Sequence, residues 1–316
     1  MRREKRRGIA LIIVLLVVTL LSVTVLEFTE QVQLQKLLSS NLEDSVRAFY
    51  MAKGGIYLAM RYLVEDLNSS DEDHLGEPWA VGLPSLPLED GVVTATITDE
   101  QGKFNLNRLI MGPERVNTRT KDAISQLFTL LNLDPSLVDA IIDWIDEDTD
   151  QLTSGADENS YYGYGTGLAD YQSKNASLDT PEELRLVAGF TDQVFDKVEP
   201  YVTIWGANRI NINTADPLVI QALINSFDPN ADQTWGQKIA EYRLANPFRQ
   251  GRMRNQLSED LGMPKPLVNR LAASTTTRSR YFRIKVEVKT PFSTVRAEAV
   301  IQRTKQSAEI LWWKIR

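Results

Sequence analysis

The chain begins with a short basic segment that is followed by a long apolar run. Residues 2–7 read RREKRR, and the 19 residues from 8 to 26, GIALIIVLLVVTLLSVTVL, contain no charged side chain. A helix of about 20 apolar residues spans a bilayer, and basic residues mark its cytoplasmic end. The pattern therefore predicts one transmembrane helix, with its N-terminus in the cytoplasm and the remaining chain on the other side of the membrane.

The helical pattern continues beyond the apolar run. Apolar residues recur at helical spacing through residues 27–67, and no proline occurs before Pro78. We therefore expect one helix over residues 9–67, transmembrane in 9–26 and amphipathic in its later part, where it packs on a globular body. The Gly54-Gly55 pair is a place where this helix can kink. A coiled coil is the alternative, but the apolar positions keep no strict heptad.

The rest of the chain predicts strands at its two ends and helices between them. Apolar and polar residues alternate in 92–98, 281–289 and 294–303, and 103–106 follows a turn as a short fourth strand. Helical segments fill the roughly 170 residues between these strands. We expect an α+β fold, in which one small antiparallel sheet packs on the long helix and a large α-helical domain is inserted between its strands.

These patterns divide the chain into six parts. They are a basic leader (1–8), the long helix (9–67), a loop with the first strands (68–106), the inserted α-helical domain (107–278), a C-terminal β-hairpin (279–303) and a tail (304–316). Within the insertion, helices are expected at 121–131, 135–146, 181–187, 192–198, 217–224, 233–246 and 265–273.

The border between basic and apolar residues has three interpretations. A cleaved secretory signal would end its apolar run in small residues, whereas this run continues into Leu26, Glu27 and Phe28. A plain signal anchor fits the pattern. A pilin-type leader also fits, because such a leader is a short basic peptide that ends in glycine before the apolar helix, and Gly8 precedes Ile9.

Composition limits the chemistry. The chain has no cysteine, and His74 is its one histidine, which excludes a disulfide framework and a thiolate site and leaves little room for histidine-based catalysis. The formal net charge is −7, and the first eight residues contribute +4, so the remainder carries −11. An acidic body argues against general nucleic-acid binding, which needs cations to meet phosphates.

An acidic segment is the strongest local signal for a ligand. Residues 143–158, DWIDEDTDQLTSGADE, contain seven acids and no base, and such carboxylates repel one another unless they are solvated, protonated or neutralised. EF-hand positions 1, 3, 5 and 12 are taken by Asp146, Asp148, Asp150 and Asp157. Position 6 is Gln151 instead of glycine, so a regular EF-hand is not expected. Oxygen ligands on a loop leaving a helix still suit Ca²⁺, and a solvated helix end is the alternative.

A second local resemblance concerns residues 209–223, RININTADPLVIQAL, with residues 236–243, GQKIAEYR. They resemble a helix-hairpin-helix element, which usually holds DNA backbone. The Leu-Pro-Gly-Ile-Gly hairpin of that element is replaced by residues 225–230, NSFDPN. Because that hairpin supplies the backbone N–H groups for phosphate contacts, its loss favours a packing module.

Taken together and in order, several segments resemble the type II secretion system minor pseudopilin K (GspK) family. They are the leader with Gly8 and its apolar helix, ITDEQGKFNLN (97–107), DAIIDWIDEDTD (139–150), TPEELRLVAGF (180–190), ININTADPLVIQAL (210–223) and YFRIKVEV (281–288). The resemblance covers nearly the whole chain. It implies a type IV pilin-like fold with a large helical insertion, and an assembly protein instead of an enzyme.

The resemblance also implies processing of the N-terminus. Prepilin peptidase would cut after Gly8, and Ile9 would become the N-methylated first residue. The fifth mature position, a glutamate in most pilins, is Ile13 here, a departure that is itself typical of the K type. In ordinary subunits this carboxylate is thought to pair with a neighbour's N-terminal amine inside the membrane. A subunit without it can begin a filament.

The family's place in the cell follows from the same resemblance. K-type proteins are placed at the tip of the periplasmic pseudopilus with the I- and J-type minor pseudopilins, and the bulky insertion would block further subunits. The major pseudopilin, the inner-membrane assembly platform and prepilin peptidase are the other implied partners, and folded proteins are exported across the outer membrane. The family's Ca²⁺ ligands are expected at Asp146, Asp148, Asp150, Asp157 and Glu158.

Two other classes of protein remain as alternatives. One is a membrane-anchored DNA-binding protein of a competence-type pilus, which would use Arg209, Lys238 and Arg243. The other is a carboxylate-dependent hydrolase, in which Asp143 and Asp146 would act as an acid and base pair.

Overall fold

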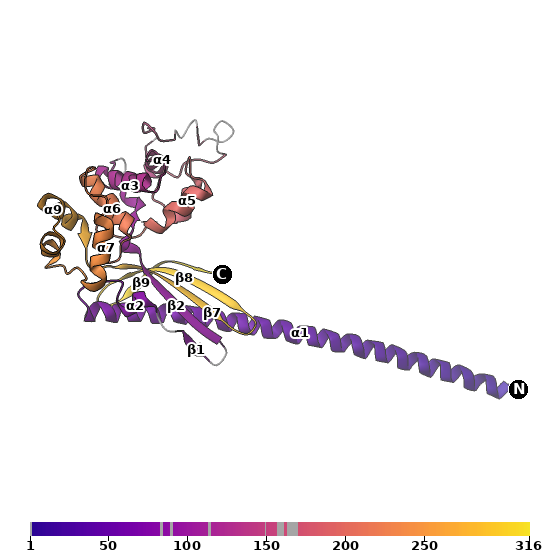
Figure 1. Cartoon of the computed structure of the whole chain (residues 1–316). Helices are drawn as coiled ribbons and strands as arrows, with labels where there is room; N and C mark the ends of the chain where they lie inside the picture. The colour runs from indigo at the N-terminus through magenta and orange to yellow at the C-terminus, as the bar shows by residue number, and fades with distance from the viewer. Residues whose placement is uncertain are drawn as a thin grey trace.

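The computed structural model of this chain describes residues 2–82, 85–88, 91–112, 115–148, 150–156, 161–162 and 170–316, with side chains from Ile9 onward. Helix α1 runs without a break from Arg2 to Ser69. Its N-terminal part projects from the body (Figure 1), and residues 9–43 are all exposed. The helix therefore extends past both ends of the predicted range and includes the basic leader.

The C-terminal part of α1 packs on the sheet through one narrow stripe. Residues at helical spacing are buried there: Ala48, Ala52, Ile56, Ala59 and Leu63. Small side chains let the helix approach closely, and a Cβ added at Gly55 would lie 2.9 Å from Cγ1 of Val286. Helix α1 continues through Gly54-Gly55 without a break, and Gly55 serves the close contact with the sheet.

The sheet has five antiparallel strands in the order β1-β2-β7-β8-β9. They are β1 (Leu86–Leu88), β2 (Gly91–Asp99), β7 (Tyr281–Lys289), β8 (Thr294–Arg303) and β9 (Ala308–Ile315). The tail predicted for residues 304–316 was therefore wrong. Strand β9 pairs with β8 across a register shift at Val300/Ile301, and such an irregularity breaks the strict alternation that marks a strand in sequence.

The inserted domain leaves the sheet after β2 and returns at β7. Its α-helices are α3 (Thr118–Leu130), α4 (Leu137–Ile145), α5 (Asp192–Val198), α6 (Pro217–Phe227), α7 (Trp235–Ala245), α8 (Met253–Asn255) and α9 (Lys265–Ser274). Short 3-10 turns are η1 (Glu100–Gly102), η2 (Leu106–Arg108), η3 (Pro181–Leu186) and η4 (Glu199–Tyr201), and η5 (Gln256–Asp260) is a π turn. Helix α2 (Pro78–Val81) precedes the sheet in the sequence and contacts β2.

The inserted domain also contains two parallel pairs of very short strands. Strand β3 (Phe104–Asn105) pairs with β4 (Val202–Thr203), and β5 (Ile210–Asn211) pairs with β6 (Thr275–Thr276). The placement of residues 103–106 in the main sheet was therefore wrong. Phe104 and Asn105 are both buried, and their partner comes from the insertion, about 100 residues later in the sequence, which a local pattern does not reveal.

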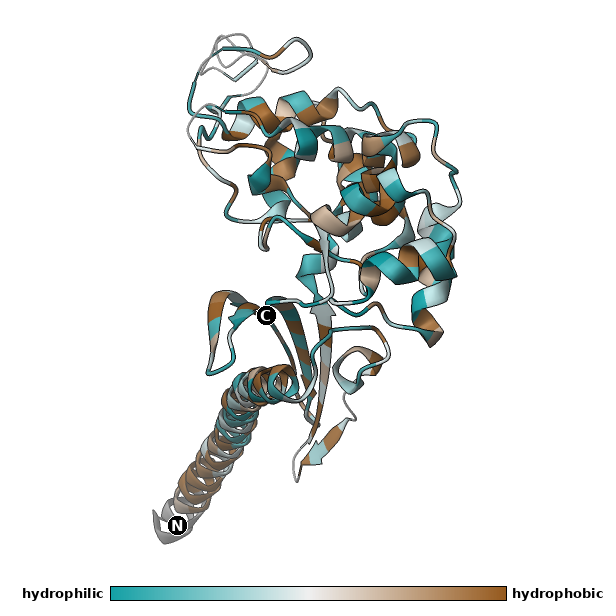
Figure 2. Ribbon diagram, turned by 90° about the vertical axis from the view of Figure 1, so that its left-hand side faces the viewer, coloured by the Kyte–Doolittle hydropathy of each residue, from teal (hydrophilic) through white to brown (hydrophobic). Residues whose placement is uncertain are grey.

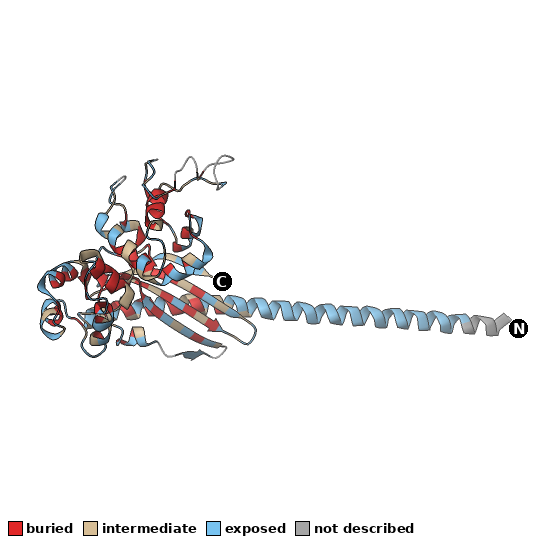
Figure 3. Ribbon diagram, turned by 45° about the horizontal axis from the view of Figure 1, so that its top comes forward, coloured by how far each residue is buried: buried red, intermediate tan, exposed pale blue. Residues whose placement is uncertain are grey.

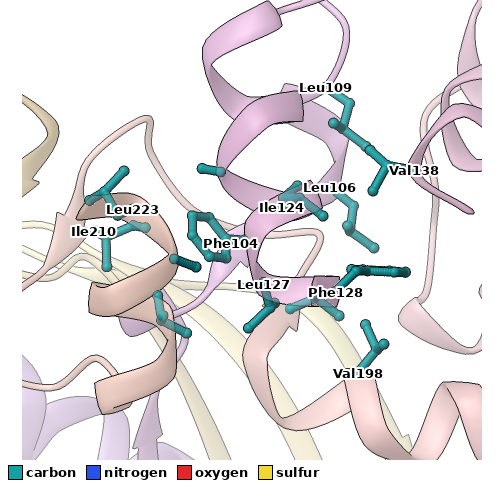
Figure 4. Packing of buried hydrophobic residues seen from close by; sticks show 14 of the residues in the cluster. Phe104, Leu106, Leu109, Ile124, Leu127, Phe128, Val138, Val198, Ile210 and Leu223 are labelled. Atoms are coloured by element: carbon teal, nitrogen blue, oxygen red, sulfur yellow. The ribbon is translucent and has the colours of Figure 1, made fainter. Parts of the chain in front are cut away.

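Two separate hydrophobic cores hold the molecule together. One lies between α1 and the sheet, and the other fills the inserted domain. Figure 3 shows buried residues in the sheet and the inserted helices, whereas the projecting part of α1 is exposed. In Figure 4, Phe104 lies between Ile124 of α3 on one side and Leu223 and Ile210 on the other. The insertion is therefore a domain with its own core.

Polar groups join the two cores. Asp99, at the end of β2, is buried and accepts hydrogen bonds from Thr214 Oγ1 at 2.6 Å and Asn211 Nδ2 at 3.1 Å, both in the insertion, and from Ser279 just before β7. Burial raises the pKa of Asp99 to about 6, although the hydroxyls of Ser279 and Thr214 lower it. A ring contact of 6.0 Å between Trp205 and Trp312 adds a second link between insertion and sheet.

Candidate functional site

The acidic segment begins on helix α4 and continues into the following loop. Asp143, on α4, and Asp146, at its C-cap, are buried with 3% and 5% exposure. Leu152 N donates to both carboxylate oxygens of Asp143, at 3.3 and 3.2 Å. A Cβ added at Gly155 would lie 1.7 Å from Asp143 Oδ2. Residues 152–156 therefore fold back over the Asp143 carboxylate, and glycine is required for that approach.

Neighbouring carboxylates on α4 differ in their partners. Asp139 pairs with Lys121 Nζ at 2.6 Å, whereas Asp143 accepts hydrogen bonds from backbone N–H groups of the described chain. Burial raises the pKa of Asp143 to about 6, the N–H groups of Leu152 and Ala156 lower it, and the charges of Asp139 and Asp148 raise it. Sequence reasoning left Asp143 out of the predicted ligands, although its spacing from Asp146 places both on one helix face.

The structure describes three of the five predicted Ca²⁺ ligands. Asp146 is buried, Asp148 is half-buried and Asp150 is exposed, and Asp148 Oδ1 accepts from Asp150 N at 2.9 Å. Asp157 and Glu158 lie outside the described residues. The side chains present all offer oxygen, as a hard cation such as Ca²⁺ requires, and the loop bends back tightly at Gly155. Among the described residues of this segment, no three carboxylates bring their oxygens within 4.8 Å of one another, so the described part offers the ligand type that Ca²⁺ prefers and not a complete coordination geometry.

A second group of carboxylates was missed by sequence reasoning. Asp66, Asp73 and Glu77 bring one oxygen each within 4.8 Å of the others. The buried guanidinium of Arg303 donates to Asp73 and, at 3.1 Å, to Asp66, while Glu77 accepts from Trp79 Nε1 at 2.8 Å. Arg303 thus supplies the positive charge for this cluster, which is a structural junction between α1, the following loop and β8.

The structure places the residues of the DNA-binding alternative in different environments. Arg243 is buried and donates to Ile212 O at 2.7 Å, and burial lowers its pKa to about 10. Lys238 pairs with Asp232 at 2.8 Å, and Arg209 is exposed. Arg243 therefore holds the protein backbone and is not available to a phosphate.

Helices α6 and α7 pack directly on each other in the region that resembles a helix-hairpin-helix. A Cβ added at Gly236 would lie 2.2 Å from Pro217 O, and Gly236 N donates to Gln221 Oε1 at 2.8 Å. Glycine at this position thus permits a close helix–helix contact. The element serves as part of the core of the insertion.

The N-terminal part of α1 has the properties of a membrane anchor. It contains a window long and apolar enough to cross a bilayer, and none of that window is buried in the structure. Figure 2 shows this part of the helix as hydrophobic, in contrast to the mixed surface nearer the body. Ile9 and Ile13, the residues expected at the first and fifth positions of a processed chain, are 59% and 56% exposed on it, and Gly8 lies in the same helix.

A long helix with an exposed apolar half, packed through its other half on an antiparallel sheet, defines a type IV pilin-like protein. Here it is enlarged by an α-helical domain inserted between the strands. A family model described as type II secretion system (T2SS), protein K, matches residues 102–207. This match lies at the start of the inserted domain and includes the acidic segment.

Known relatives match over longer stretches. Type II secretion system protein K of Klebsiella pneumoniae is 32% identical over 68% of this chain and 68% of its own length. The Pseudomonas aeruginosa protein K is 30% identical over 72% and 70%, and the Aeromonas hydrophila protein K is 25% identical over 98% and 96%. The chain belongs to the type II secretion system protein K family, and it is a minor pseudopilin.

A solved structure has the same fold. A chain of the GspK-GspI-GspJ complex from the enterotoxigenic Escherichia coli type 2 secretion system is 21% identical and superposes with a TM-score of 0.71. The match covers 88% of this chain and 99% of that chain. The fold over most of this chain is therefore that of the solved protein.

Proposed function

We propose that this protein lies at the tip of the pseudopilus, where it begins assembly and caps the filament, and so helps to export folded proteins across the outer membrane. The position of the inserted domain carries this proposal. In Figure 1 the domain lies at the end of α1 opposite the membrane anchor and reaches past that end. A further subunit stacked above would meet this domain.

The long helix supplies the contacts to other subunits. Beyond the expected membrane segment it still exposes large apolar side chains, including Phe28, Leu34, Leu38 and Leu42 at 58–67%. Exposed apolar surface of this extent is typical of an interaction site. We propose that it packs against the helices of I- and J-type minor pseudopilins and of the major pseudopilin. The assembly platform of the inner membrane and prepilin peptidase are the other proposed partners.

Processing and orientation belong to the same proposal. The basic residues before the apolar run favour a cytoplasmic N-terminus and a periplasmic body. Prepilin peptidase would cut after Gly8 and leave an N-methylated Ile9. Ile13 then offers no carboxylate to the N-terminal amine of a subunit above it, which suits a first subunit.

The tip position can be tested by labelling. An epitope is fused after the exposed C-terminal residue Arg316, and isolated pseudopili are labelled with gold-conjugated antibody for electron microscopy. We expect gold at one end of each filament, because a capping subunit occurs once. Gold spaced along the filament sides would contradict the proposal.

We also propose that the acidic loop holds a structural Ca²⁺ through Asp146, Asp148 and Asp150, together with Asp157 and Glu158. When bound, Ca²⁺ would neutralise carboxylates that the fold crowds at the end of α4. Ca²⁺ at 100 times its dissociation constant would stabilise the folded protein by about 2.7 kcal/mol. That corresponds to an unfolding midpoint higher by about 5–10 °C.

The Ca²⁺ proposal is tested by thermal unfolding of the full chain with Ca²⁺ and with a chelator. Asp146→Asn with Asp148→Asn should remove the shift, because both substitutions delete a charge and a ligand. Glu259→Gln is the matched control, since Glu259 is exposed on another part of the insertion, and it should keep the shift. Equal midpoints with and without Ca²⁺ in the unmodified chain would refute the site.

A further inference from the structure

A cavity of about 470 Å³ opens in the inserted domain, and none of the described residues of the acidic loop lines it. It is lined by residues 103–111, 115–123 and 207–210, by Leu223 of α6 and by the end of α9. Phe104, Ile210 and Leu223 form an apolar part of its wall, and Figure 4 shows these three side chains near one another beside α3. The cavity is thus built on the rigid core of the insertion.

Among the residues that the structure describes, the charged side chains that line this cavity are all basic. They are Lys103, Arg108, Arg115, Arg119 and Arg209. Lys103 pairs with Glu100 at 3.2 Å. The four arginines are exposed, and no described carboxylate pairs with them. Glu114, in the adjoining loop, lies outside the described residues.

This concentration of positive charge contrasts with the body as a whole, which carries a formal charge of −11 after residue 8. Some other arginines of the body pair with carboxylates, such as Arg185 with Asp196, Arg283 with Glu100 and Arg296 with Glu287. Exposed arginines elsewhere that pair with no described carboxylate, such as Arg252 and Arg254, do not line this cavity. Unpaired guanidinium groups of like charge repel one another when they gather. The fold gains nothing from their proximity, which suggests a ligand.

The surroundings of the cavity add to its preference for anions. The first turn of α3 lines it, and the start of a helix carries partial positive charge. A second hollow of about 520 Å³ shares Arg119, Ala273 and Ser274 with the first. The two hollows adjoin at these residues and form one groove, in which the arginine-lined first hollow is the anion-binding part, since Asp122 lines the second.

We propose that this groove binds an acidic peptide segment of a partner protein, with aspartate or glutamate side chains on Arg108, Arg115, Arg119 and Arg209. The planar guanidinium group matches a carboxylate through two parallel hydrogen bonds. The apolar wall beside the arginines suits the aliphatic part of such a segment. Binding of this peptide does not require assembly of a pseudopilus.

Other anions fit less well. Lipid headgroups of the anchoring membrane are distant, because the helix between residues 27 and 69 is about 65 Å long at about 1.5 Å per residue and the cavity lies in the domain at its far end. Nucleic acid binding requires basic residues along an extended backbone track, whereas these arginines surround one hollow in an acidic body.

The test uses the full chain in neutral detergent micelles and a fluorescein-labelled hexaglutamate peptide, with binding followed by fluorescence anisotropy. Arg115→Gln with Arg119→Gln removes two cavity arginines. Arg252→Gln with Arg254→Gln is the matched control, because it removes two exposed arginines of the same domain that do not line this cavity. The basic N-terminal sequence contributes the same background to every variant. We expect saturable binding that weakens at least tenfold in the cavity variant and less than twofold in the control.

Three results would overturn the proposal. They are no saturable binding by the unmodified chain, equal weakening in the two variants, and displacement of the peptide by a hexathymidylate oligonucleotide or by inorganic phosphate at equal or lower concentration. The last result would assign the groove to nucleic acid or to phosphate. Far-ultraviolet circular dichroism of each variant verifies that it is folded before the titration.

Discussion

At the scale of single residues, the buried carboxylates differ in what neutralises them. Asp73 lies against the guanidinium of Arg303, and Glu100 lies between Lys103 and Arg283 at 3.2 and 2.7 Å. Asp99 instead accepts hydrogen bonds from neutral hydroxyl, amide and N–H groups. A carboxylate that is desolvated without a cation favours its protonated form, so Asp99 makes the stability of the junction depend on pH.

The raised pKa of Asp99 determines whether the free energy of unfolding rises or falls with pH. Burial raises the pKa of Asp99 from 3.8 to about 6 in the folded protein. The folded state therefore binds more protons than the unfolded state between these values, and the free energy of unfolding falls as the pH rises through this window. The loss amounts to about 3 kcal/mol and is complete above pH 6.

The variant Asp99→Asn removes this titration. We expect the free energy of unfolding of the original chain, relative to that of the variant, to fall by about 2 kcal/mol between pH 4 and pH 7, because pH 4 already lies just above the unfolded pKa of 3.8. Urea titrations at the two pH values measure this difference. A difference that stays constant with pH would show that Asp99 does not titrate in this window.

At the scale of elements, the long helix combines three environments in one continuous unit. Its first part is apolar and exposed, its middle part exposes scattered apolar side chains, and its last part is buried against the sheet. The adjacent glycines in the last part have different surroundings. A Cβ at Gly54 would meet nothing within 4 Å, whereas a Cβ at Gly55 would lie 2.9 Å from Val286 and 3.3 Å from Val93.

This pair offers a matched test of helix packing. Gly54→Ala should stabilise the protein by about 0.5–1 kcal/mol, because alanine favours a helix interior. Gly55→Ala should destabilise it by about 1–3 kcal/mol, because the added carbon overpacks the contact with the sheet. Both values come from urea unfolding of the full chain in detergent. Equal effects of the two substitutions would mean that α1 does not pack closely on β7 at Gly55.

The elements also show what the sequence could predict. The long helix, β7 and β8 follow from strong, regular patterns: β7 and β8 have their expected bounds, and the helix expected over 9–67 extends from Arg2 to Ser69. Strand β9 contains two adjacent tryptophans, Trp312 and Trp313, and a register shift, so its alternation is incomplete. The short strand β3 depends on a partner from elsewhere in the chain. Such pairing is decided by tertiary contacts and not by local preference.

At the scale of the whole molecule, the order of motifs was more informative than any one of them. The family and the pilin-like fold with its inserted domain were predicted from the sequence and are confirmed by the relatives and the solved structure. The junction around Arg303 was not predicted, because its partners Asp66 and Asp73 lie more than 200 residues away in the sequence. The basic cavity likewise gathers arginines from three separate segments.

The central claim is that this chain enters a pseudopilus as a processed pilin-like subunit. The most direct measurement is the intact mass and N-terminal sequence of the protein from its native membrane. We expect a chain that lacks the first eight residues and begins with N-methylated Ile9. A chain that begins at Met1 would contradict prepilin processing and, with it, assembly at the tip of the filament.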